Sequence, residues 1–309
     1  MQIGILEPKD FSKVALEKLS EIGDVALFDG NNLNKFISNK DIIFTRLKYF
    51  LDTNFLDSAL NLKYICSPTT GLNHLDLDTC NQKKIKVISL KGEFEFLSTI
   101  RATPEHTFGL VLSLLRNYKD AFLSKDSIKW HREQYKGFEL SSNSVGIIGF
   151  GRVGRQLSKY FEAFDTKVYF YDVDQSIKEV NNSIKLNSIK DLIEKSNIVI
   201  LSASYCSNNF EFFDKKYIDL LEDKYFINTA RGELVEESYL LQKIDQSYFK
   251  GVAIDVMQNE QSLNNLDELM NLTNKRNFIL TPHIAGATYS SMYRTEEFIV
   301  DKLQEFLID

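Results

Sequence analysis

The fold is decided by the stretch Ser144-Val145-Gly146-Ile147-Ile148-Gly149-Phe150-Gly151-Arg152-Val153-Gly154. An apolar strand runs into three glycines at the spacing G-x-G-x-x-G, and a potential helix follows at 156–163. In this pattern Gly149 permits a tight turn, Gly151 lets backbone approach a pyrophosphate, and Gly154 lets helix and strand pack closely. The free N–H groups at the start of the helix then face the phosphates. The stretch therefore predicts a dinucleotide-binding turn, with Arg152 and Val153 among the residues that contact the cofactor.

A second strand, Lys167–Tyr171, ends in Asp172, 18 residues after Gly154. A carboxylate at this place accepts hydrogen bonds from a ribose diol and repels a 2′-phosphate. No arginine occurs in residues 173–177 to reverse that preference. Asp172 thus favours NAD over NADP, and the alternative is a solvated acid at the end of a strand.

Composition bounds the class of protein. The chain has 309 residues, 43% of them hydrophobic and 26% charged, with a net charge of −6, which is typical of a globular protein large enough for two domains. The negative net charge does not indicate the basic surface that binds nucleic acid. No apolar run is long enough to span a membrane. The N-terminus has no basic region of a signal peptide. Three widely spaced cysteines, Cys66, Cys80 and Cys206, suggest free thiols in a reducing cytoplasm and no metal site.

Short apolar strands alternate with helical segments in the first part of the chain, which predicts a parallel α/β sheet covered on both faces. Each of its helices is expected to open with an aspartate as N-cap. The expected helices are Asp10–Ile22, Asp52–Leu60 and Asp76–Lys83, and the expected strands are Gln2–Leu6, Asp24–Phe28, Asp41–Thr45, Lys63–Ser67 and Lys86–Leu90.

A long helical stretch then begins at Thr103-Pro104-Glu105, where proline suits a first turn. Its dense apolar face fits either a subunit interface or an ordinary buried helix. A second α/β unit follows from Asn143, with six strands in the doubly wound arrangement that binds its cofactor at the carboxyl ends of the strands. A last helix, Tyr289–Leu307, can pack back onto the first unit. Besides the two strands already named, the expected strands are Ile198–Ser202, Tyr225–Thr229, Gly251–Val256 and Phe278–Thr281, with helices at Ile189–Lys195, Lys215–Leu221 and Glu236–Gln246.

Polar residues follow three of these strands. Arg231 leaves the first, Glu260 lies past the second, and His283 follows the third. An arginine can grip a carboxylate with two parallel hydrogen bonds, and a histidine can exchange the proton of a hydroxyl as a hydride moves. A glutamate beside that histidine would favour the imidazolium form. Each residue alone fits an ordinary surface or packing role, but their occurrence together at the expected cofactor edge indicates chemistry.

At these positions the chain resembles the D-isomer-specific 2-hydroxyacid dehydrogenases, the family that includes D-3-phosphoglycerate dehydrogenases. The motifs that carry the resemblance are N-x-x-R-G at 228–232, D-V-x-x-x-E at 255–260 and P-H-x-x-G at 282–286. The resemblance implies that Arg231 orients the substrate, Glu260 tunes the base and His283 is the proton donor. It also implies that Asp255 binds the nicotinamide carboxamide.

Further contacts follow from the same resemblance. The loop with Thr70 and Gly71 would hold the substrate carboxylate through backbone N–H groups, and Thr229, Ala230 and Gly286 would line the cofactor. The helix region 103–120 would form the interface of a homodimer. The implied fold is α/β with two doubly wound parallel-sheet domains: a flavodoxin-like substrate-binding domain, residues 1–98 and 287–309, and a Rossmann NAD-binding domain, residues 99–286.

Three departures from the family pattern stand out. The proline that usually follows the catalytic glutamate is Gln261, and the H-x-P-x-T element appears as Ser202-Ala203-Ser204-Tyr205-Cys206. The segment 90–97 is bulkier and more acidic than usual.

At a first-unit strand end, Arg46 and Lys48 fit either a site for a distal phosphate or, more simply, a solvated surface.

The sequence thus predicts a cytoplasmic NAD-dependent oxidoreductase that interconverts a D-2-hydroxy acid and its 2-keto acid, with the substrate held between two closing domains. A non-catalytic NAD-sensing adaptor of the same fold is the alternative from another class. A dehydrogenase of another Rossmann family with a lysine acid is a third, but no lysine occurs in the strand-end motifs.

Overall fold

A computed structural model of the chain describes residues 1–124, 130–260, 266–275 and 277–308. It divides into two compact units, residues Met1–Ile100 with Ala287–Asp309, and residues Arg101–Gly286. Each unit is built on its own parallel sheet. The predicted α/β class with two doubly wound domains is confirmed.

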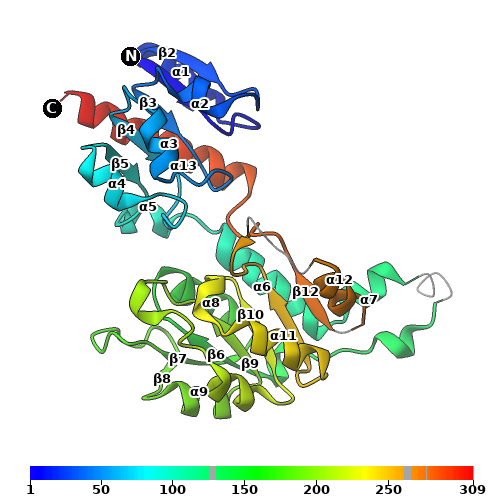
Figure 1. The fold of residues 1–309 in the computed structure, drawn as a ribbon. Helices are drawn as coiled ribbons and strands as arrows, with labels where there is room; N and C mark the ends of the chain where they lie inside the picture. Colours follow the sequence, from blue (N-terminus) through cyan, green and yellow to red (C-terminus); the bar gives the residue numbers. More distant parts are fainter. Residues whose placement is uncertain (125–129, 261–265, 276, 309) are drawn as a thin grey trace. The chain divides into compact units, whose positions relative to one another are not determined.

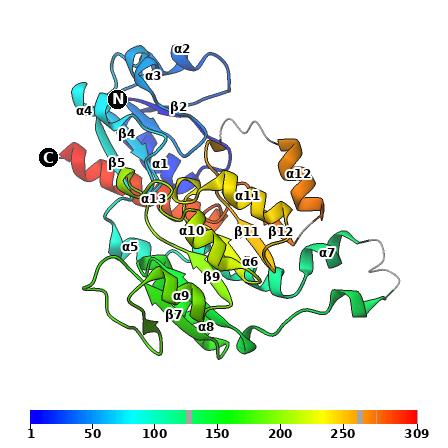
Figure 2. The same cartoon turned by 60° about the horizontal axis from the view of Figure 1, so that its bottom comes forward.

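The first unit has a five-stranded sheet in the order β2-β1-β3-β4-β5, which is the flavodoxin-like order. On one face, α1 and the C-terminal α13 share a core with the sheet, and α2, α3 and α4 share the core on the other. Figures 1 and 2 both show α13 beside α1, so the two ends of the chain complete one domain. Its elements are β1 (Gln2–Ile5), α1 (Lys13–Ile22), β2 (Asp24–Leu27), α2 (Leu33–Ile37), β3 (Ile42–Phe44), α3 (Thr53–Ser58), β4 (Tyr64–Ser67), α4 (Leu77–Gln82), β5 (Lys86–Ser89), α5 (Phe94–Ser98) and α13 (Tyr289–Ile308).

The second unit has a seven-stranded sheet in the order β12-β11-β10-β9-β6-β7-β8. The strand order reverses beside β6, where a Rossmann domain binds its nucleotide. Helices α6 and α8 share a core with one face of the sheet, and α9, α10, α11 and α12 with the other. Its elements are α6 (Ala102–Leu115), α7 (Tyr118–Leu123), β6 (Ser144–Ile148), α8 (Arg152–Ala163), β7 (Lys167–Tyr171), β8 (Ile184–Lys185), α9 (Ile189–Lys195), β9 (Ile198–Leu201), α10 (Lys215–Ile218), β10 (Tyr225–Asn228), α11 (Glu237–Asp245), β11 (Gly251–Ile254), α12 (Leu266–Lys275) and β12 (Phe278–Leu280), with short 3-10 turns between some of them.

Several expected element bounds were wrong for local reasons. Helix α1 begins at Lys13 with Ser12 as its N-cap, because Asp10 has a left-handed backbone, φ 53°, and lies outside the helix. Asp52 and Asp76 do cap α3 and α4, as predicted. The stretch after residue 103 is broken, since α6 ends at Leu115 and Asn117, φ 51°, turns the chain into α7. The strand β8 and the helix α2 were missed because two and five residues are too short to show a period.

The cysteines are free thiols, with Cys66 and Cys80 buried and Cys206 exposed. Burial raises the pKa of Cys80 to about 11, so this thiol stays protonated. Among the helices of the described residues, none is both long and apolar enough to cross a bilayer.

Candidate active site

The glycine turn between β6 and α8 has the geometry that a dinucleotide requires. Gly149 has φ 91°, and a Cβ on it would lie 2.6 Å from the backbone of Ala203. A Cβ on Gly154 would lie 2.5 Å from the carbonyl oxygen of Gly149, so α8 packs directly on the turn. Gly151 faces open space, which leaves room for a phosphate at the start of α8. The cradle therefore fits a pyrophosphate.

Arg152 and Val153 form the first turn of α8, which begins four residues before the expected helix at 156–163. Arg152 is half-buried, and burial together with the nearby Arg101 lowers the pKa of its guanidinium. Two like charges close together raise the local positive potential at this helix N-terminus, where the anionic part of a nucleotide would lie.

Asp172 follows β7 and is held beside the glycine turn. Its Oδ2 accepts a hydrogen bond from the N–H of Phe150 at 2.7 Å, and its Oδ1 accepts one from Asp174 at 2.9 Å. The carboxylate is therefore part of the turn itself and not a solvated strand-end acid. Each oxygen retains acceptor capacity for a hydroxyl.

Ser202 is a polar residue that the sequence pattern did not single out as a ligand. It follows β9, and its N–H donates to the carbonyl of Ile148 at 2.8 Å. Its hydroxyl is buried and has no hydrogen-bond partner among the residues that the structure describes. A buried hydroxyl in this state is costly, and its position beside Gly149 suits a group that a bound nucleotide supplies. The only signal in the sequence was that Ser202 replaces the histidine of the family's H-x-P-x-T element.

The carboxyl ends of three neighbouring parallel strands, β10, β11 and β12, carry the predicted catalytic set. After β10, the side chain of Asn228 organises the turn: its Oδ1 accepts from Ala230 N at 3.0 Å and its Nδ2 donates to Arg231 O at 3.0 Å. Thr229 is buried and its hydroxyl bonds that of Thr107 at 2.7 Å. The turn therefore fixes the backbone from which Arg231 projects.

Arg231 is set for an anionic ligand. Burial lowers the pKa of its guanidinium, and the charges of Glu233 and Glu260 oppose that shift. One of its nitrogens, Nη1, donates to its neighbour's carbonyl, Ala230 O, at 2.6 Å. The guanidinium has five N–H donors, so others remain for a ligand.

Asp255, at the end of β11, ties that strand to the segment after β12. It is 1% exposed and accepts hydrogen bonds from the Thr281 hydroxyl at 2.5 Å, Ile284 N at 2.9 Å and Ala285 N at 2.8 Å. His106 Nε2 lies 3.4 Å from the same carboxylate. Burial acts to raise the pKa of Asp255, but these hydrogen bonds outweigh it and hold the pKa low. Asp255 is thus a charged anchor for the His283 segment.

His283 and Glu260 form a pair. The Nδ1 atom of His283 lies 2.7 Å from Glu260 Oε2. The backbone of His283 is left-handed, φ 52°, and its N–H donates to Asp255 O at 2.8 Å. Glu260 also acts on Arg231 electrostatically. The structure thus brings Arg231, Glu260 and His283 together, while Gln261 lies outside the described residues.

The predicted carboxylate-binding loop belongs to the first unit. It follows β4, and the Thr69 hydroxyl donates to Gly71 O at 2.8 Å. The hydroxyls of Ser67 and Thr69 are 2.8 Å apart, and His74 Nε2 is 3.2 Å from Ser67 Oγ. These contacts fix the loop from below and leave Thr70 exposed at its tip.

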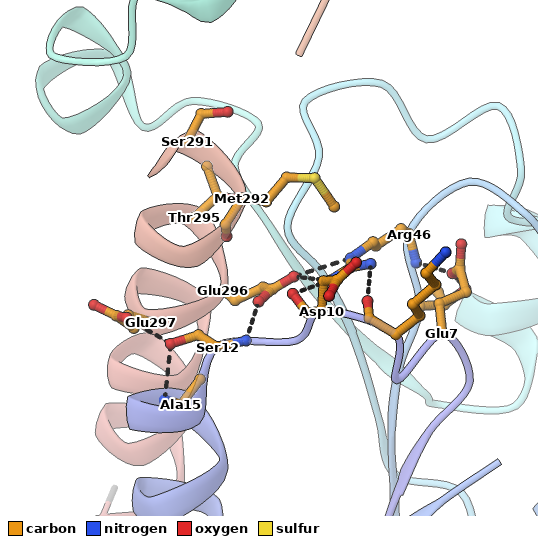
Figure 3. A network of polar contacts seen from close by, with 12 residues as sticks. Glu7, Asp10, Ser12, Ala15, Arg46, Ser291, Met292, Thr295, Glu296 and Glu297 are labelled. Carbon is orange, nitrogen blue, oxygen red and sulfur yellow. Dashed lines mark hydrogen bonds and ion pairs between the residues drawn. The ribbon is translucent and has the colours of Figure 1, made fainter. Parts of the chain in front are cut away.

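Arg46 belongs to a buried ion pair, so it is neither a solvated residue nor a free phosphate ligand. Figure 3 shows its guanidinium facing Glu296 of α13, whose side chain is fully buried. Arg46 Nε donates to Glu296 Oε1 at 2.9 Å, and Ser12 N donates to Glu296 Oε2 at 2.7 Å. Burial raises the pKa of Glu296, and Ser12 and Arg46 oppose that shift. The pair joins α13 to the loops of the first unit.

Comparison with known proteins finds the same fold. The glyoxylate reductase of Thermofilum pendens is 27% identical over 302 residues, which are 93% of this chain and 86% of that protein. The D-lactate dehydrogenase of Aquifex aeolicus, solved with NAD and lactic acid, has a TM-score of 0.84 at 24% identity and covers 99% of this chain and 95% of its own. An NAD-dependent formate dehydrogenase of Staphylococcus aureus, solved with NAD, has a TM-score of 0.83 at 23% identity, covering 99% and 96%. These structures share the fold with different substrates.

The sequence model described as the NAD-binding domain of D-isomer specific 2-hydroxyacid dehydrogenases matches residues 108–285. The match spans the glycine turn, Asp172 and all three strand ends of the candidate site. The chain therefore belongs to the D-isomer specific 2-hydroxyacid dehydrogenase family, and its cofactor is NAD.

Proposed function

We propose that the protein interconverts a D-2-hydroxy acid and its 2-keto acid, with His283 as the acid–base residue. The observation that carries this proposal is the 2.7 Å contact between His283 Nδ1 and Glu260, with Arg231 beside it. Bound NAD supplies a hydride acceptor, and NADH a hydride donor, at the nicotinamide ring. The remaining requirements of the reaction are a place for the carboxylate and a path for one proton.

His283 meets the proton requirement. Its Nδ1 is engaged with Glu260, so Nε2 is the nitrogen that exchanges a proton with substrate. In reduction, Nε2 gives its proton to the carbonyl oxygen as the carbonyl carbon gains a hydride, which yields the hydroxyl. In oxidation, Nε2 takes the hydroxyl proton. Glu260 stabilises the imidazolium in both directions through its negative charge.

Arg231 meets the carboxylate requirement. Its half-buried guanidinium offers a planar pair of donors that matches a carboxylate, and a partly desolvated contact of this kind is stronger than one in water. The backbone of Thr70 and Gly71 is a second proposed contact for the carboxylate, and this assignment rests on the family resemblance.

The cofactor contacts belong to the glycine turn, Arg152, Val153 and Asp172, with further contacts from Thr229, Ala230, Asp255 and Gly286. Asp172 favours NAD over NADP, because its carboxylate would repel a 2′-phosphate. Asp255 accepts several hydrogen bonds within the protein. A role for it in holding the carboxamide would therefore use the remaining acceptor capacity of the carboxylate.

Turnover tests the proposal directly. A panel of 2-keto acids with NADH should reveal a substrate, and His283→Ala should lower kcat by at least about a hundredfold, as expected for loss of an acid–base residue. Arg231→Ala should raise KM and lower kcat together. Tyr289→Ala, an exposed position on α13, serves as a control. Full turnover in His283→Ala would remove the mechanism, and no turnover on any substrate would favour an NAD-sensing adaptor.

We also propose that the protein is a cytoplasmic homodimer formed through the region 103–120, which holds most of α6 and the start of α7. The apolar face of α6 packs on its own sheet, so this helix alone does not require a partner. Large apolar side chains next to it are exposed, with Phe122 at 79% and Trp130 at 87%, and such groups are typical of interfaces. Sedimentation analysis should show a dimer for the wild-type protein. The Phe122→Ser variant should dimerise more weakly.

A further inference from the structure

Among the described residues of the loop that carries Glu260, one backbone N–H holds the carboxylate in place. Glu260 Oε1 accepts a hydrogen bond from Met257 N at 3.1 Å, while Oε2 bonds His283. Asn259, between them, has a left-handed backbone, φ 53°. Met257 N belongs to the peptide that joins Val256 to Met257, and the next peptide, between Met257 and Gln258, shares the Cα atom of Met257 with it. The aim of the carboxylate therefore depends on the backbone of Met257, and so on where that next peptide lies.

That peptide packs against Gly232, the residue after Arg231. A Cβ on Gly232 would lie 2.0 Å from the carbonyl carbon of Met257 and 2.4 Å from Gln258 N. Only glycine permits this approach. The backbone next to the arginine and the loop with the glutamate therefore touch, but packing on a glycine does not fix the tilt of the peptide.

Hydrogen bonds from the backbone and side chain of Gln258 fix the tilt of this peptide. Glu237, the first residue of α11, accepts a hydrogen bond from Gln258 N through Oε2 at 2.7 Å. The side chain of Gln258 donates to Glu211 Oε1 and to Val235 O, both at 2.9 Å. Helix α11 is itself rigidly placed, since Leu240, Leu241 and Ile244 are buried in the core.

Burial and the negative charges around Glu237 make the ionised form of its carboxyl group costly. Glu237 is half-buried, and burial raises the pKa of its carboxyl. The carboxylates of Glu233, Glu260 and Glu211 raise that pKa further, and the hydrogen bond from Gln258 opposes them. An acceptor without charge would satisfy the Gln258 N–H at lower cost. The negative charge is therefore better explained by a short, charge-assisted hydrogen bond that holds the loop firmly.

We propose that Glu237 is a positioning residue for the acid–base pair: its carboxylate fixes the peptide between Met257 and Gln258 and thereby aims Glu260 at His283. That Glu260 and His283 act in acid–base chemistry rests on the proposed function. The positioning itself rests on the contacts of Gln258 and Glu260.

Titration of the His283 ring followed by NMR tests the proposal without any substrate. The chain has four histidines, so the ring signal of His283 is assigned by its loss in His283→Ala. In Glu237→Ala, the loop loosens and Glu260 stabilises the imidazolium less. The ring of His283 in Glu237→Ala should then titrate at lower pH than the same ring in the wild type.

Two further variants separate positioning from general stability. In Glu237→Gln the amide oxygen still accepts the Gln258 N–H, so the midpoint should lie between those of Glu237→Ala and the wild type. Glu236→Ala is the matched control, because Glu236 lies at the same helix end and its Oε2 accepts from Lys215 N at 2.9 Å, with no hydrogen bond to the described residues of the loop. Its midpoint should stay at the wild-type value.

An unchanged midpoint in Glu237→Ala, or an equal shift in Glu236→Ala, overturns the proposal. In turnover assays, the falling limb of the pH profile for keto-acid reduction should move to lower pH in Glu237→Ala, with KM for NADH unchanged. A shifted ring titration in a protein with no turnover would sink the proposed function and leave the positioning role intact.

Discussion

The hydroxyl of Ser202 is buried beside the glycine turn without a partner in the described structure. In the free protein it carries the cost of an unmade hydrogen bond. A nucleotide that reaches Gly149 would bring polar atoms to this position. We therefore expect Ser202 to link the stability of the free protein to its affinity for the cofactor.

Ser202→Ala should increase the free energy of unfolding of the nucleotide-free protein by about 1 kcal/mol, because the unsatisfied hydroxyl is removed. The same change should weaken NADH binding about fivefold, measured by fluorescence titration. Ser204→Ala, at an exposed position two residues later, should alter neither quantity. A less stable Ser202→Ala protein would show that the hydroxyl is satisfied before the cofactor binds.

The sequence predicted several candidate site residues at this scale because local motifs carry them. Arg231, Glu260 and His283 are recognised by their spacing after strands, and Asp172 by its distance from the glycines. Glu237 was missed, since its role depends on a backbone N–H 21 residues away. The partner of Arg46 was missed for the same reason, as Glu296 lies 250 residues along the chain.

At the scale of elements, the turn between β6 and α8 assigns different tasks to its glycines. Gly154 is closely packed, since a Cβ added to it would lie 2.5 Å from Gly149 O. Gly151 faces open space and has an ordinary φ of −74°. Gly154 is therefore required by the packing of the fold, whereas Gly151 leaves space for the ligand.

Gly151→Ala should therefore leave the free energy of unfolding within about 1 kcal/mol of the wild type, while its methyl group obstructs NADH binding. Gly154→Ala should destabilise the fold by about 1 to 3 kcal/mol through overpacking. Urea unfolding and NADH titration of both proteins measure the contrast. Equal losses of stability in the two variants would contradict this division of roles.

Elements with strong local signals were predictable from sequence, and weak ones were not. Asp52 and Asp76 cap their helices as expected because each is followed at once by helical backbone. Asp10 failed as a cap because Ser12, two residues on, has its hydroxyl within reach of Ala15 N and its N–H bonded to Glu296. That second contact comes from the far end of the chain, which no local pattern reveals.

At the scale of the whole molecule, the first unit is discontinuous. Helix α13 contributes Ile299, Val300 and Leu303, all fully buried, to the core with Ile3, Ile5 and Leu19. Each such side chain contributes about 1.5 to 3 kcal/mol when buried. Their sum is comparable to the whole stability of a typical domain, so the first unit depends on the last helix.

A fragment of residues 101–286 should fold and bind NADH, since its sheet and both cores are contiguous in sequence. A fragment of residues 1–100 should not fold alone, and adding a peptide of residues 287–309 should restore its structure. Circular dichroism melts and NADH fluorescence measure each case. A cooperative melt of residues 1–100 without the peptide would show that α13 is dispensable.

The split first domain also sets an order of events during synthesis on the ribosome. Its strands emerge well before the helix that covers them, which begins about 190 residues after Ile100. At the usual speed of translation that interval is on the order of 10 to 40 s. The nucleotide-holding half can mature in that time, while the apolar face of the earliest segment waits uncovered. During that interval the first unit of the nascent chain offers chaperones an apolar face, which α13 covers once it has emerged.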